Sequence, residues 1–512
     1  MAVIVNEGFI KKAVDLKRPL KETEHFPVNT VKFAENEACF QNLEAVKEDN
    51  FSLPVILNPS ESVTLDFKEH FVGYISLTLD HFPEKRITDS PVRLYFSFGE
   101  FPLEIMTPPE EYKGGLGSGW LQNEERSFVF LPARGTLDRR YSFRYLKIKR
   151  TDSGAFPVKI TNIKVNAVSA VSLEDAPTYE ASDERLKKIY DMSVKTLKEC
   201  EQEVFEDGPK RDRRLWIGDL RLQALTDYRI FSNLDLIKRC IYLFAGATGE
   251  HKMVAPCIFP DSPPYVDEWT FCDYSLYFIS CLYDYLLNTD DLALVTELYD
   301  TARAQADIVF SHINTEKGIT DLRPFVDWCP DLDKSVAFFG IFIYTMKQLI
   351  FISERLKKDY SVIDSYIEAV KTALLKFLDK DKMLFITSSG QLSVHSNVWA
   401  VLSSVLTEEE NLLILDNIKK IDTPFTMRTP YMRHFYIEAL YNNGLFAEAL
   451  EFIKEYWGKI ADAGFDCCPE VFNPENEFES PYRAPEINSA CHAWSCTPAY
   501  WIPILTDKIN SI

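Results

Sequence analysis

A short segment, residues 205–220, concentrates side chains that can act as acids, bases or sugar-binding groups: Asp207, Arg211, Asp212, Trp216 and Asp219. The Gly-Pro pair after Asp207 breaks a helix, so we expect the next residues to lie on irregular backbone. Loops of this kind are where a scaffold presents reactive groups. A helix that resumes at Leu215 places Trp216 and Asp219 on one face. The spacing predicts that carboxylates, a guanidinium and an indole converge here.

Further acidic and aromatic residues lie in the long connections of the second half of the chain. They are Trp269, Asp273, Asp327, Trp328 and Glu470, with His492 and Trp494 near the last expected helix. Indole faces cover the C–H surface of a sugar ring, while carboxylates and arginine bind its hydroxyls through charge-assisted hydrogen bonds. If these connections open at one end of the domain, they form a cup that binds a carbohydrate.

Cleavage of a glycosidic bond requires two carboxyl groups, one to protonate the leaving oxygen and one to activate water or attack directly. Asp212 and Glu470 are our candidate pair. Asp212 lies among lysines and arginines, however, and can instead be one arm of a surface ion pair. Glu470 follows a proline and can be a solvated turn residue. Packing or core roles are the alternative for several other candidates: Trp269, Asp327, Trp328, His492 and Trp494.

The first part of the chain has the pattern of strands. Apolar and polar residues alternate from residue 62 to about residue 170, with turn formers between the runs. We therefore expect an antiparallel β-sandwich over residues 61–170, with residues 1–60 as an N-terminal extension packed on it. The longest connection, residues 100–125, contains the stretch GGLGSGW. It lacks the spacing of a phosphate-binding motif, so we expect a flexible loop.

A linker, residues 171–182, precedes a region in which apolar residues recur with helical period. Twelve helical runs are expected, at residues 183–203, 215–231, 233–246, 270–288, 290–313, 333–356, 361–380, 394–405, 407–418, 430–443, 446–462 and 488–506. Several joints between them are short, which favours antiparallel hairpins. The prediction is a multidomain β plus α protein, with the sandwich followed by an (α/α)6 toroid over residues 183–512.

Composition limits the partners of this chain. It has 56 basic and 77 acidic residues, a net charge of −21, which opposes binding to nucleic acid or to anionic membranes. No apolar run reaches the ~18–20 residues of a membrane span. The N-terminus lacks the apolar stretch of a signal peptide, so we expect a cytoplasmic protein. No cofactor is expected, and the oligomeric state stays open.

The cysteines favour reduced thiols over a disulfide framework, because there are eleven of them and no CxxC motif. Cys467 and Cys468 are adjacent, and Cys491 precedes His492. This spacing lacks the paired ligands of a zinc site. We therefore expect buried free cysteines and no metal.

Two stretches resemble a known family. Asp207-Gly-Pro-Lys-Arg-Asp212, then Trp216, Gly218 and Asp219, is similar to the D-C-P-x-R-D-E-R-L-G-W-T-G-D strip of the α-L-rhamnosidases of glycoside hydrolase family 78 and their six-hairpin relatives. Near the C-terminus, a Trp-Gly pair, the loop that bears Glu470 and the S-x-x-H-x-W motif that ends at Trp494 resemble the ending of such enzymes. A preceding β-sandwich also suits the family.

The strip departs from the family pattern in three ways. Gly208 replaces the usual cysteine, the strip is one residue short, and Asp212 stands where glutamate is common. Aligned from its Trp-x-Gly-Asp end, the strip places the family's acid on Asp212. Aligned from Asp207 without a gap, it would place the acid on Arg213, which cannot donate a proton in this role.

The resemblance implies an inverting glycoside hydrolase that removes a terminal sugar, L-rhamnose or a related one, from oligosaccharides or glycosides. Asp212 falls on the general acid and Glu470 on the general base, with the carboxyl groups about 6.5–9.5 Å apart. Sugar-binding positions fall on Asp207, Trp216, Asp219 and His492, and more loosely on Asp327 and Trp328. Two alternatives stay open: a six-hairpin phosphorylase or lyase for another sugar, and a catalytically silent carbohydrate-binding protein.

Overall fold

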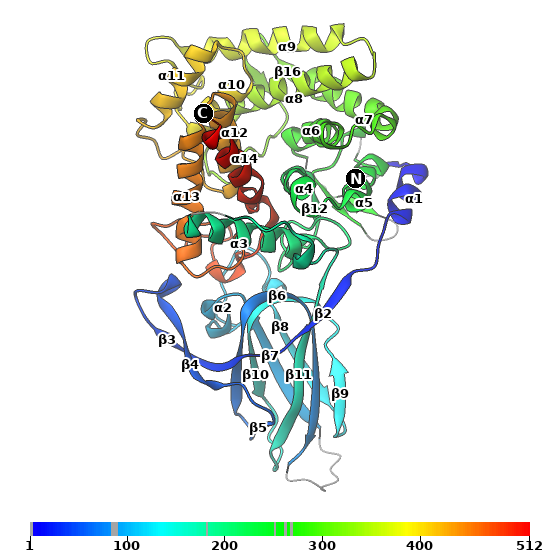
Figure 1. The fold of residues 1–512 in the computed structure, drawn as a ribbon, viewed down its shortest axis with the longest axis vertical. Coiled ribbons are helices and arrows are strands. Elements are labelled where there is room, and N and C mark those ends of the chain that lie inside the picture. Colours follow the sequence, from blue (N-terminus) through cyan, green and yellow to red (C-terminus); the bar gives the residue numbers. More distant parts are fainter. Residues whose placement is uncertain are drawn as a thin grey trace.

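The chain forms a strand-rich domain followed by a larger helical domain, which lie at opposite ends of the molecule (Figure 1). This is a computed structural model, and it describes residues 4–82, 91–180, 183–249, 252–260, 264–266 and 270–511. The order of the two domains is the one expected from the change of hydrophobic period near residue 183.

Within the described residues, ten antiparallel strands form the first domain. They are β2 (Lys21–His25), β3 (Asn29–Glu35), β4 (Leu43–Asn50), β5 (Val55–Leu57), β6 (Ser62–His81), β7 (Val92–Gly99), β8 (Asn123–Phe128), β9 (Ala133–Thr136), β10 (Tyr141–Arg150) and β11 (Val158–Ser169). Strand β6 pairs with β10 along its first half and with β11 along its second. The sheet therefore stays continuous while its apolar face encloses one core, to which Leu65, Phe96, Leu146 and Ile163 contribute.

The N-terminal residues divide between the two domains. Strands β2 to β5 belong to the sheet, because β2 and β5 pair with β11 and β3 pairs with β6. Helix α1 (Glu7–Asp15) instead packs on α5 (Leu234–Gly246). The prediction that residues 1–60 pack on the β domain is therefore wrong for α1. Its apolar face finds a partner on α5, where Arg239 Nη1 donates to the carbonyl of Ala13 at 2.5 Å.

Twelve helices follow in the described part of the second domain. They are α3 (Glu184–Cys200), α4 (Ile217–Ile230), α5, α6 (Cys272–Thr289), α7 (Leu292–Ser311), α8 (Ser335–Arg355), α9 (Ser361–Leu374), α10 (Val394–Leu402), α11 (Glu408–Ile418), α12 (Pro430–Asn442), α13 (Phe446–Asp462) and α14 (Pro498–Asn510). Each overlaps one predicted run. Short strands join some of them: β12 (Leu215–Trp216), β13 (Ala247–Thr248), β14 (Cys257–Phe259), β15 (Tyr265–Val266), β16 (Ile313–Asn314), β17 (Ile319–Thr320), β18 (Leu378–Asp379) and β19 (Leu384–Phe385), while β1 (Ile4–Val5) pairs with β13.

Helices α4, α6, α8, α10 and α12 contact one another in that order, and α14 packs against α3, α4 and α13. The last hairpin of the chain therefore touches the first. This contact is what brings the two sequence motifs into one place.

The last helix begins later than its pattern predicts. A run at residues 488–506 was expected, but α14 begins at Pro498. The backbone before it is used for other hydrogen bonds: the N–H of His492 donates to the carbonyl of Cys468 and that of Ala493 to the carbonyl of Asp207. Residues 488–497 are therefore a connection that joins the segments of the candidate site.

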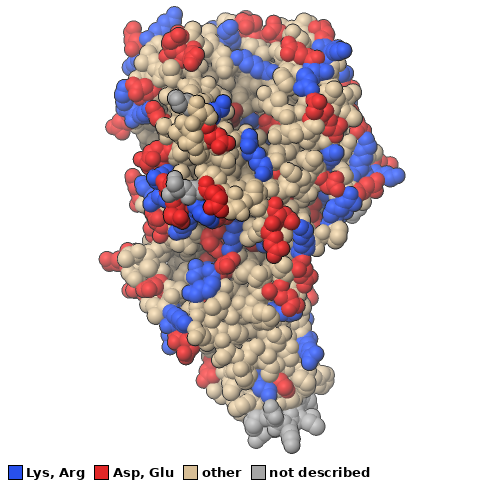
Figure 2. All heavy atoms as spheres, viewed as in Figure 1, with Lys and Arg blue, Asp and Glu red and all other residues tan. Residues whose placement is uncertain are grey.

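Helix α8 is long and apolar enough to meet the composition of a membrane span, but 72% of its apolar window is buried inside the protein. It packs against α6, α9 and α10, as a core helix does. On the face drawn in Figure 2, acidic and basic side chains are interspersed over both domains. The net negative charge is not gathered into one patch on this face.

Candidate active site

A cavity of about 360 Å³ holds most of the predicted site residues. The predicted residues that line it are Asp207, Arg211, Asp212, Trp216, Asp219, Trp328, Glu470, His492 and Trp494. They come from the connection between α3 and α4, from the start of α4, from the connection before α8 and from residues 463–497 after α13. We call it the central cavity. The prediction of a cup formed by the long connections is confirmed for these segments.

Arg211 links the two candidate catalytic carboxyl groups. Its Nη1 atom lies 3.3 Å from Asp212 Oδ1, and its Nη2 atom lies 2.5 Å from Glu470 Oε2. The guanidinium is 4% exposed and lies over the ring of Tyr482, 4.0 Å from the ring centre. One buried cation therefore orients both carboxyls toward the same space, although 258 positions separate Asp212 from Glu470 in the sequence.

Glu470 accepts hydrogen bonds at both its side chain and its backbone carbonyl. Tyr482 donates its hydroxyl to Oε1 at 2.5 Å, and Trp494 donates its indole N–H to the backbone carbonyl of Glu470 at 2.9 Å. Both side-chain oxygens thus accept hydrogen bonds, which is the arrangement of a carboxylate that can receive a proton from water. Glu470 is 2% exposed, so it is not a solvated turn residue.

Asp212 has the environment of an acid. Burial raises its pKa, and this effect outweighs the nearby cations Arg211 and Arg214, which lower it. The charge of Glu470 acts in the same direction as burial. The side chain is 17% exposed, so Asp212 is not a member of a surface ion pair and can still reach a leaving group.

Asp207 shapes the loop that carries Asp212. Its Oδ1 accepts the backbone N–H of Arg214 at 3.0 Å and its Oδ2 accepts that of Asp212 at 3.2 Å. Gly208 lies inside this turn, where a Cβ would stand 2.5 Å from the carbonyl oxygen of Arg211. The glycine that replaces the family's cysteine is thus required by the tight loop. Burial, together with the charge of Asp212, raises the pKa of Asp207 to about 8.

Asp219 and His492 form a second polar pair at the cavity. His492 Nδ1 lies 3.6 Å from Asp219 Oδ1, and His492 Nε2 lies 4.0 Å from Asp207 Oδ2. Burial raises the pKa of Asp219 well above its usual value and lowers that of His492 well below, which favours the neutral form of each. Within the described residues, no hydrogen bond is made by Asp219 Oδ1, His492 Nδ1 or Trp216 Nε1. Sugar hydroxyls can satisfy such atoms.

Aromatic and apolar side chains complete the wall. Besides the predicted tryptophans they are Leu116, Trp120, Phe271, Tyr274, Phe325 and Tyr482, with Arg214 beside them. Tyr274 lies against Gly218, where a Cβ would stand 2.6 Å from its ring, so the glycine of the Trp-x-Gly-Asp motif lets α4 approach α6. These residues were not predicted, because a single side chain outside a motif gives no signal by itself.

Leu116 and Trp120 come from the β domain. They belong to the glycine-rich stretch that was expected to be a flexible loop. The N–H of Gly115 donates to the carbonyl of Tyr482 at 2.6 Å, and Arg214 lies 5.7 Å from the centre of the Trp120 ring. The tryptophan that ends GGLGSGW was the available signal. The stretch brings the β domain to the rim of the central cavity.

Two predicted residues lie behind the wall. Asp273 is fully buried and accepts the backbone N–H groups of Phe325 and Val326. Asp327 accepts hydrogen bonds from His395, Thr429 and two backbone N–H groups, those of Trp328 and Arg428. Neither residue lines the central cavity, whereas Asp327 is among the residues that line a larger cavity beside it. Trp269 lies outside the described residues.

A larger cavity of about 890 Å³ lies beside the central one. Trp328 lines both, and its ring meets that of Tyr482 edge-on with centres 6.0 Å apart. Arg428, Arg433 and Glu479 are among its polar residues. This outer cavity offers room for groups attached to whatever the central cavity holds.

Comparison with known proteins gives a consistent result. Residues 27–167 match the model of the N-terminal domain of glycosyl hydrolase family 78 α-rhamnosidases, and residues 174–504 match that of the bacterial α-L-rhamnosidase six-hairpin glycosidase domain. Comparison with curated protein sequences gave no match.

Solved structures of rhamnosidases resemble this chain in sequence or in fold. A rhamnosidase from Klebsiella oxytoca with rhamnose bound is 37% identical, with a TM-score of 0.93 over 98% of this chain and 99% of that one. The family 78 rhamnosidase of Bacillus sp. GL1 shares the fold at 18% identity and a TM-score of 0.74, over 90% of this chain and 49% of that one. The Streptomyces avermitilis α-L-rhamnosidase complexed with L-rhamnose also shares the fold. It is 14% identical, with a TM-score of 0.66 over 95% of this chain and 44% of that one.

Proposed function

The chain belongs to glycoside hydrolase family 78 and is an α-L-rhamnosidase-like glycosidase, and we propose that it removes a terminal L-rhamnose, or a closely related sugar, by an inverting two-carboxylate mechanism. The observation that carries this proposal is Arg211, which contacts Asp212 and Glu470 at the same cavity. An enzyme of this kind needs one protonated and one ionised carboxyl on opposite sides of the scissile bond.

In the proposed reaction, Glu470 takes a proton from water while Asp212 gives one to the leaving glycosidic oxygen. The hydrogen bonds that Glu470 accepts from Arg211 and Tyr482 support the role of base. The burial that raises the pKa of Asp212 supports the role of acid. The attacking water then enters from the side of Glu470, and the anomeric configuration inverts.

The wall of the central cavity favours a deoxy sugar. L-Rhamnose carries a methyl group at C6 in place of a hydroxymethyl group, and the aromatic side chains can cover this methyl and the C–H faces of the ring. The unpaired polar atoms of Trp216, Asp219 and His492 can bind the ring hydroxyls. The outer cavity then takes the aglycone or the next sugar.

Two further parts of the proposal concern architecture and location. We infer that the six hairpins close into an (α/α)6 toroid, which the packing of α14 on α3 and α4 supports. We also infer that the protein works in the cytoplasm with a carbohydrate as its only substrate partner. Ten buried free cysteines support a reducing compartment.

The test is a panel of aryl α- and β-glycosides, in which the anomer of the released sugar is followed by NMR. We expect turnover of the α-L-rhamnoside and the β-anomer as the first product. First release of the α-anomer would show retention and contradict the assigned roles. Phosphate-dependent formation of a sugar phosphate, or an unsaturated product, would instead identify a phosphorylase or a lyase.

A further inference from the structure

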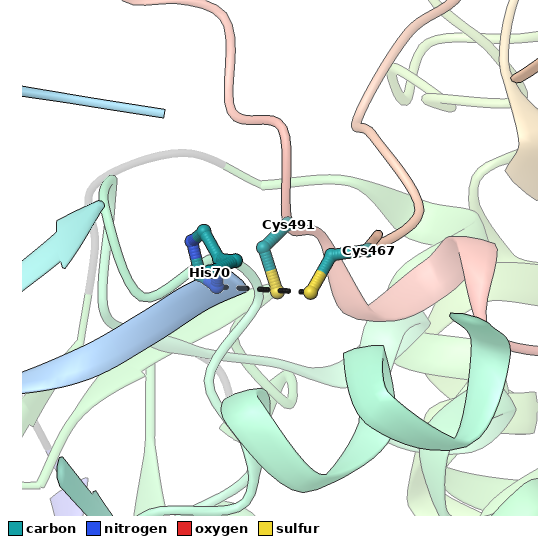
Figure 3. A group of neighbouring side chains, drawn as sticks. All are labelled: His70, Cys467 and Cys491. Atoms are coloured by element: carbon teal, nitrogen blue, oxygen red, sulfur yellow. Dashed lines mark hydrogen bonds between the residues drawn. The ribbon is translucent and has the colours of Figure 1, made fainter. Parts of the chain in front are cut away.

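Three potential metal ligands from distant parts of the chain meet at the interface of the two domains. His70 lies on β6, while Cys467 and Cys491 lie on the connection between α13 and α14, and Figure 3 shows their ring and thiols facing one another. All three side chains are buried, and their ligand atoms lie within 4.8 Å of one another. His70 Nδ1 is 3.7 Å from the sulfur of Cys467.

The ring of His70 is oriented as a metal ligand would be. Its Nε2 lies 3.0 Å from Glu100 Oε1, which also accepts the hydroxyl of Ser142 at 2.8 Å. Glu100 Oε2 accepts the backbone N–H of Ala490 and lies 3.6 Å from Lys210 Nζ, so its oxygens act as acceptors. The proton between His70 and Glu100 therefore belongs to Nε2, and in the neutral ring Nδ1 keeps a lone pair that points at the thiols.

This carboxylate-histidine arrangement is the one that orients histidine ligands in metal sites. The distance between the ring and one of the thiols also fits. A zinc ion with Zn–S bonds of about 2.3 Å and a Zn–N bond of about 2.0–2.1 Å separates tetrahedral ligand atoms by roughly 3.3–3.8 Å. The 3.7 Å between His70 Nδ1 and the Cys467 sulfur lies in that interval.

A fourth ligand is available on α3. The sulfur of Cys200 lies 4.0 Å from that of Cys491, and the three cysteines form one buried cluster with Ala493. Cys200 is 0% exposed. A structural zinc site is closed by four protein ligands. Cys200 lies outside the group of three whose ligand atoms are within 4.8 Å of one another, so its thiol must move toward the other ligands to complete the set.

Sequence spacing concealed this set. The four residues lie at positions 70, 200, 467 and 491, and none forms the short pair that marks a zinc motif. The expectation of no metal rested on that spacing alone. Contact between the β domain and the last connection of the helical domain assembles the ligands.

We propose that His70, Cys467 and Cys491, with Cys200 as the fourth ligand, bind one structural Zn²⁺ ion. On binding, each cysteine forms a sulfur–zinc bond and releases its thiol proton to solvent, while the imidazole donates the Nδ1 lone pair; no electron is transferred. A small cavity of about 10 Å³, lined by His70, Glu100 and Cys467 among others, borders the cluster.

The position of the site means that the ion would hold the connection between α13 and α14 in place. Cys467 precedes Glu470 by three residues, and Cys491 precedes His492. An ion held by both cysteines, by β6 and by α3 fixes the two ends of the connection that carries Glu470 and Tyr482. Loss of zinc should therefore loosen this connection without removing any side chain of the central cavity.

The test measures bound metal in the full-length protein, produced with zinc in the medium and dialysed. We expect about one zinc per chain by mass spectrometry of the digested protein. After removal of zinc with a chelator under reducing conditions, Co²⁺ should restore the visible absorption of a tetrahedral site and the near-ultraviolet band of thiolate-to-cobalt charge transfer. These readouts do not depend on activity.

Variants locate the ion. His70→Gln, Cys467→Ser and Cys491→Ser should each lower bound zinc to below about 0.2 per chain. Cys468→Ser is the matched control, because Cys468 is equally buried and next in sequence but lies 3.6 Å from the hydroxyl of Ser193. It should keep the full zinc content. Cys200→Ser should keep some zinc but lose it sooner to a chelator.

Several results would overturn the proposal. The proposal fails if the wild-type protein contains no zinc and shows no absorption bands after addition of Co²⁺. This result is decisive even if every variant fails to fold. Equal zinc in the wild type and in a soluble Cys491→Ser variant would place the ion elsewhere. A native mass two hydrogens lower, reversed by a reductant, would show that Cys491 forms a disulfide with Cys467 or Cys200 instead.

Discussion

The two sets of buried aspartates in the helical domain differ in what their oxygens touch. Asp207 and Asp219 are 5% and 2% exposed, and Asp273 and Asp327 are 0% and 1% exposed, so burial alone does not distinguish them. Asp327 accepts four hydrogen bonds, from His395, Thr429 and two backbone N–H groups. Asp219 Oδ1 has none within the described residues.

Asp327 and Asp207 differ in their affinity for a proton. Burial acts to raise the pKa of Asp327, but the hydrogen bonds and charge of its partners outweigh it, and the pKa is lowered. At Asp207 burial and the charge of Asp212 prevail, and the pKa is raised to about 8. A buried carboxyl whose oxygens all accept hydrogen bonds from the protein supports the fold, whereas an oxygen without a partner, such as Asp219 Oδ1, is available to a substrate.

The largest expected effect is on turnover. Asp212→Asn and Glu470→Gln should each lower kcat by about 10³-fold or more, because each removes a proton-transfer group while keeping the side-chain volume. Release of nitrophenol from an aryl α-L-rhamnoside measures this. Thermal unfolding should change little, and Asp300→Asn, on an exposed part of α7, is the control for both measurements. Near-normal rates in both variants would refute the assignment.

At Asp327 we expect a loss of stability with little loss of activity. Asp327→Ala should lower the free energy of unfolding by about 3–5 kcal/mol, because it leaves the buried His395, Thr429 and two backbone N–H groups without their acceptor. The activity per folded molecule should stay within a few-fold of the wild type. Chemical denaturation measures the free energy of unfolding, and active-site titration measures the activity per folded molecule. A variant of normal stability that has lost activity would place Asp327 among the catalytic groups.

Asp207 should make the stability of the protein depend on pH. Asp207 has a folded-state pKa of about 8, against 3.8 for an ordinary aspartate, so between these values the folded chain holds a proton that the unfolded chain releases. The stabilisation from this group is complete below about pH 4 and is lost as pH rises to about 8. Asp207→Asn should flatten the fall in melting temperature over this interval. An unchanged slope would show that Asp207 is ionised in the folded protein.

The same pKa directions predict the alkaline limit of activity. Because burial raises the pKa of Asp212, the acid form should persist toward neutral pH and kcat/KM should fall as this group loses its proton. A pH profile of kcat/KM measures this. Arg214→Met removes a cation that lowers this pKa, so the alkaline limb should move to higher pH.

The smallest effect is expected from the β-domain stretch. Trp120→Ala should raise KM about 3–10-fold with little change in kcat, because the ring lines the cavity without reaching the reacting atoms. Trp120→Phe should restore most of the affinity. Steady-state kinetics on an aryl rhamnoside and on a disaccharide separate a contact with the sugar from one with the leaving group. A large loss of kcat would instead show that the stretch positions Arg214.

Periodicity was enough to find the helices, because an amphipathic helix repeats its apolar residues locally. The local pattern of residue types was also enough for the strip around Asp212, whose residues lie within fifteen positions of one another. It did not find Tyr482, Trp120 or Tyr274, since each contacts the cavity through packing between segments that are far apart in sequence. It assigned Asp273 and Asp327 to the cavity because residue type does not reveal which side of a wall a side chain occupies.

The sequence by itself determined the order of the two domains, the twelve helical runs and the two motifs that hold Asp212 and Glu470. Only the tertiary structure decided which carboxyls meet a cavity, which donors each accepts, and that Cys467 and Cys491 meet His70 with Cys200 beside them. The reason is physical. Hydrophobic period and turn chemistry act over a few residues, whereas hydrogen bonding, desolvation and ligand geometry depend on neighbours that only the folded chain brings together.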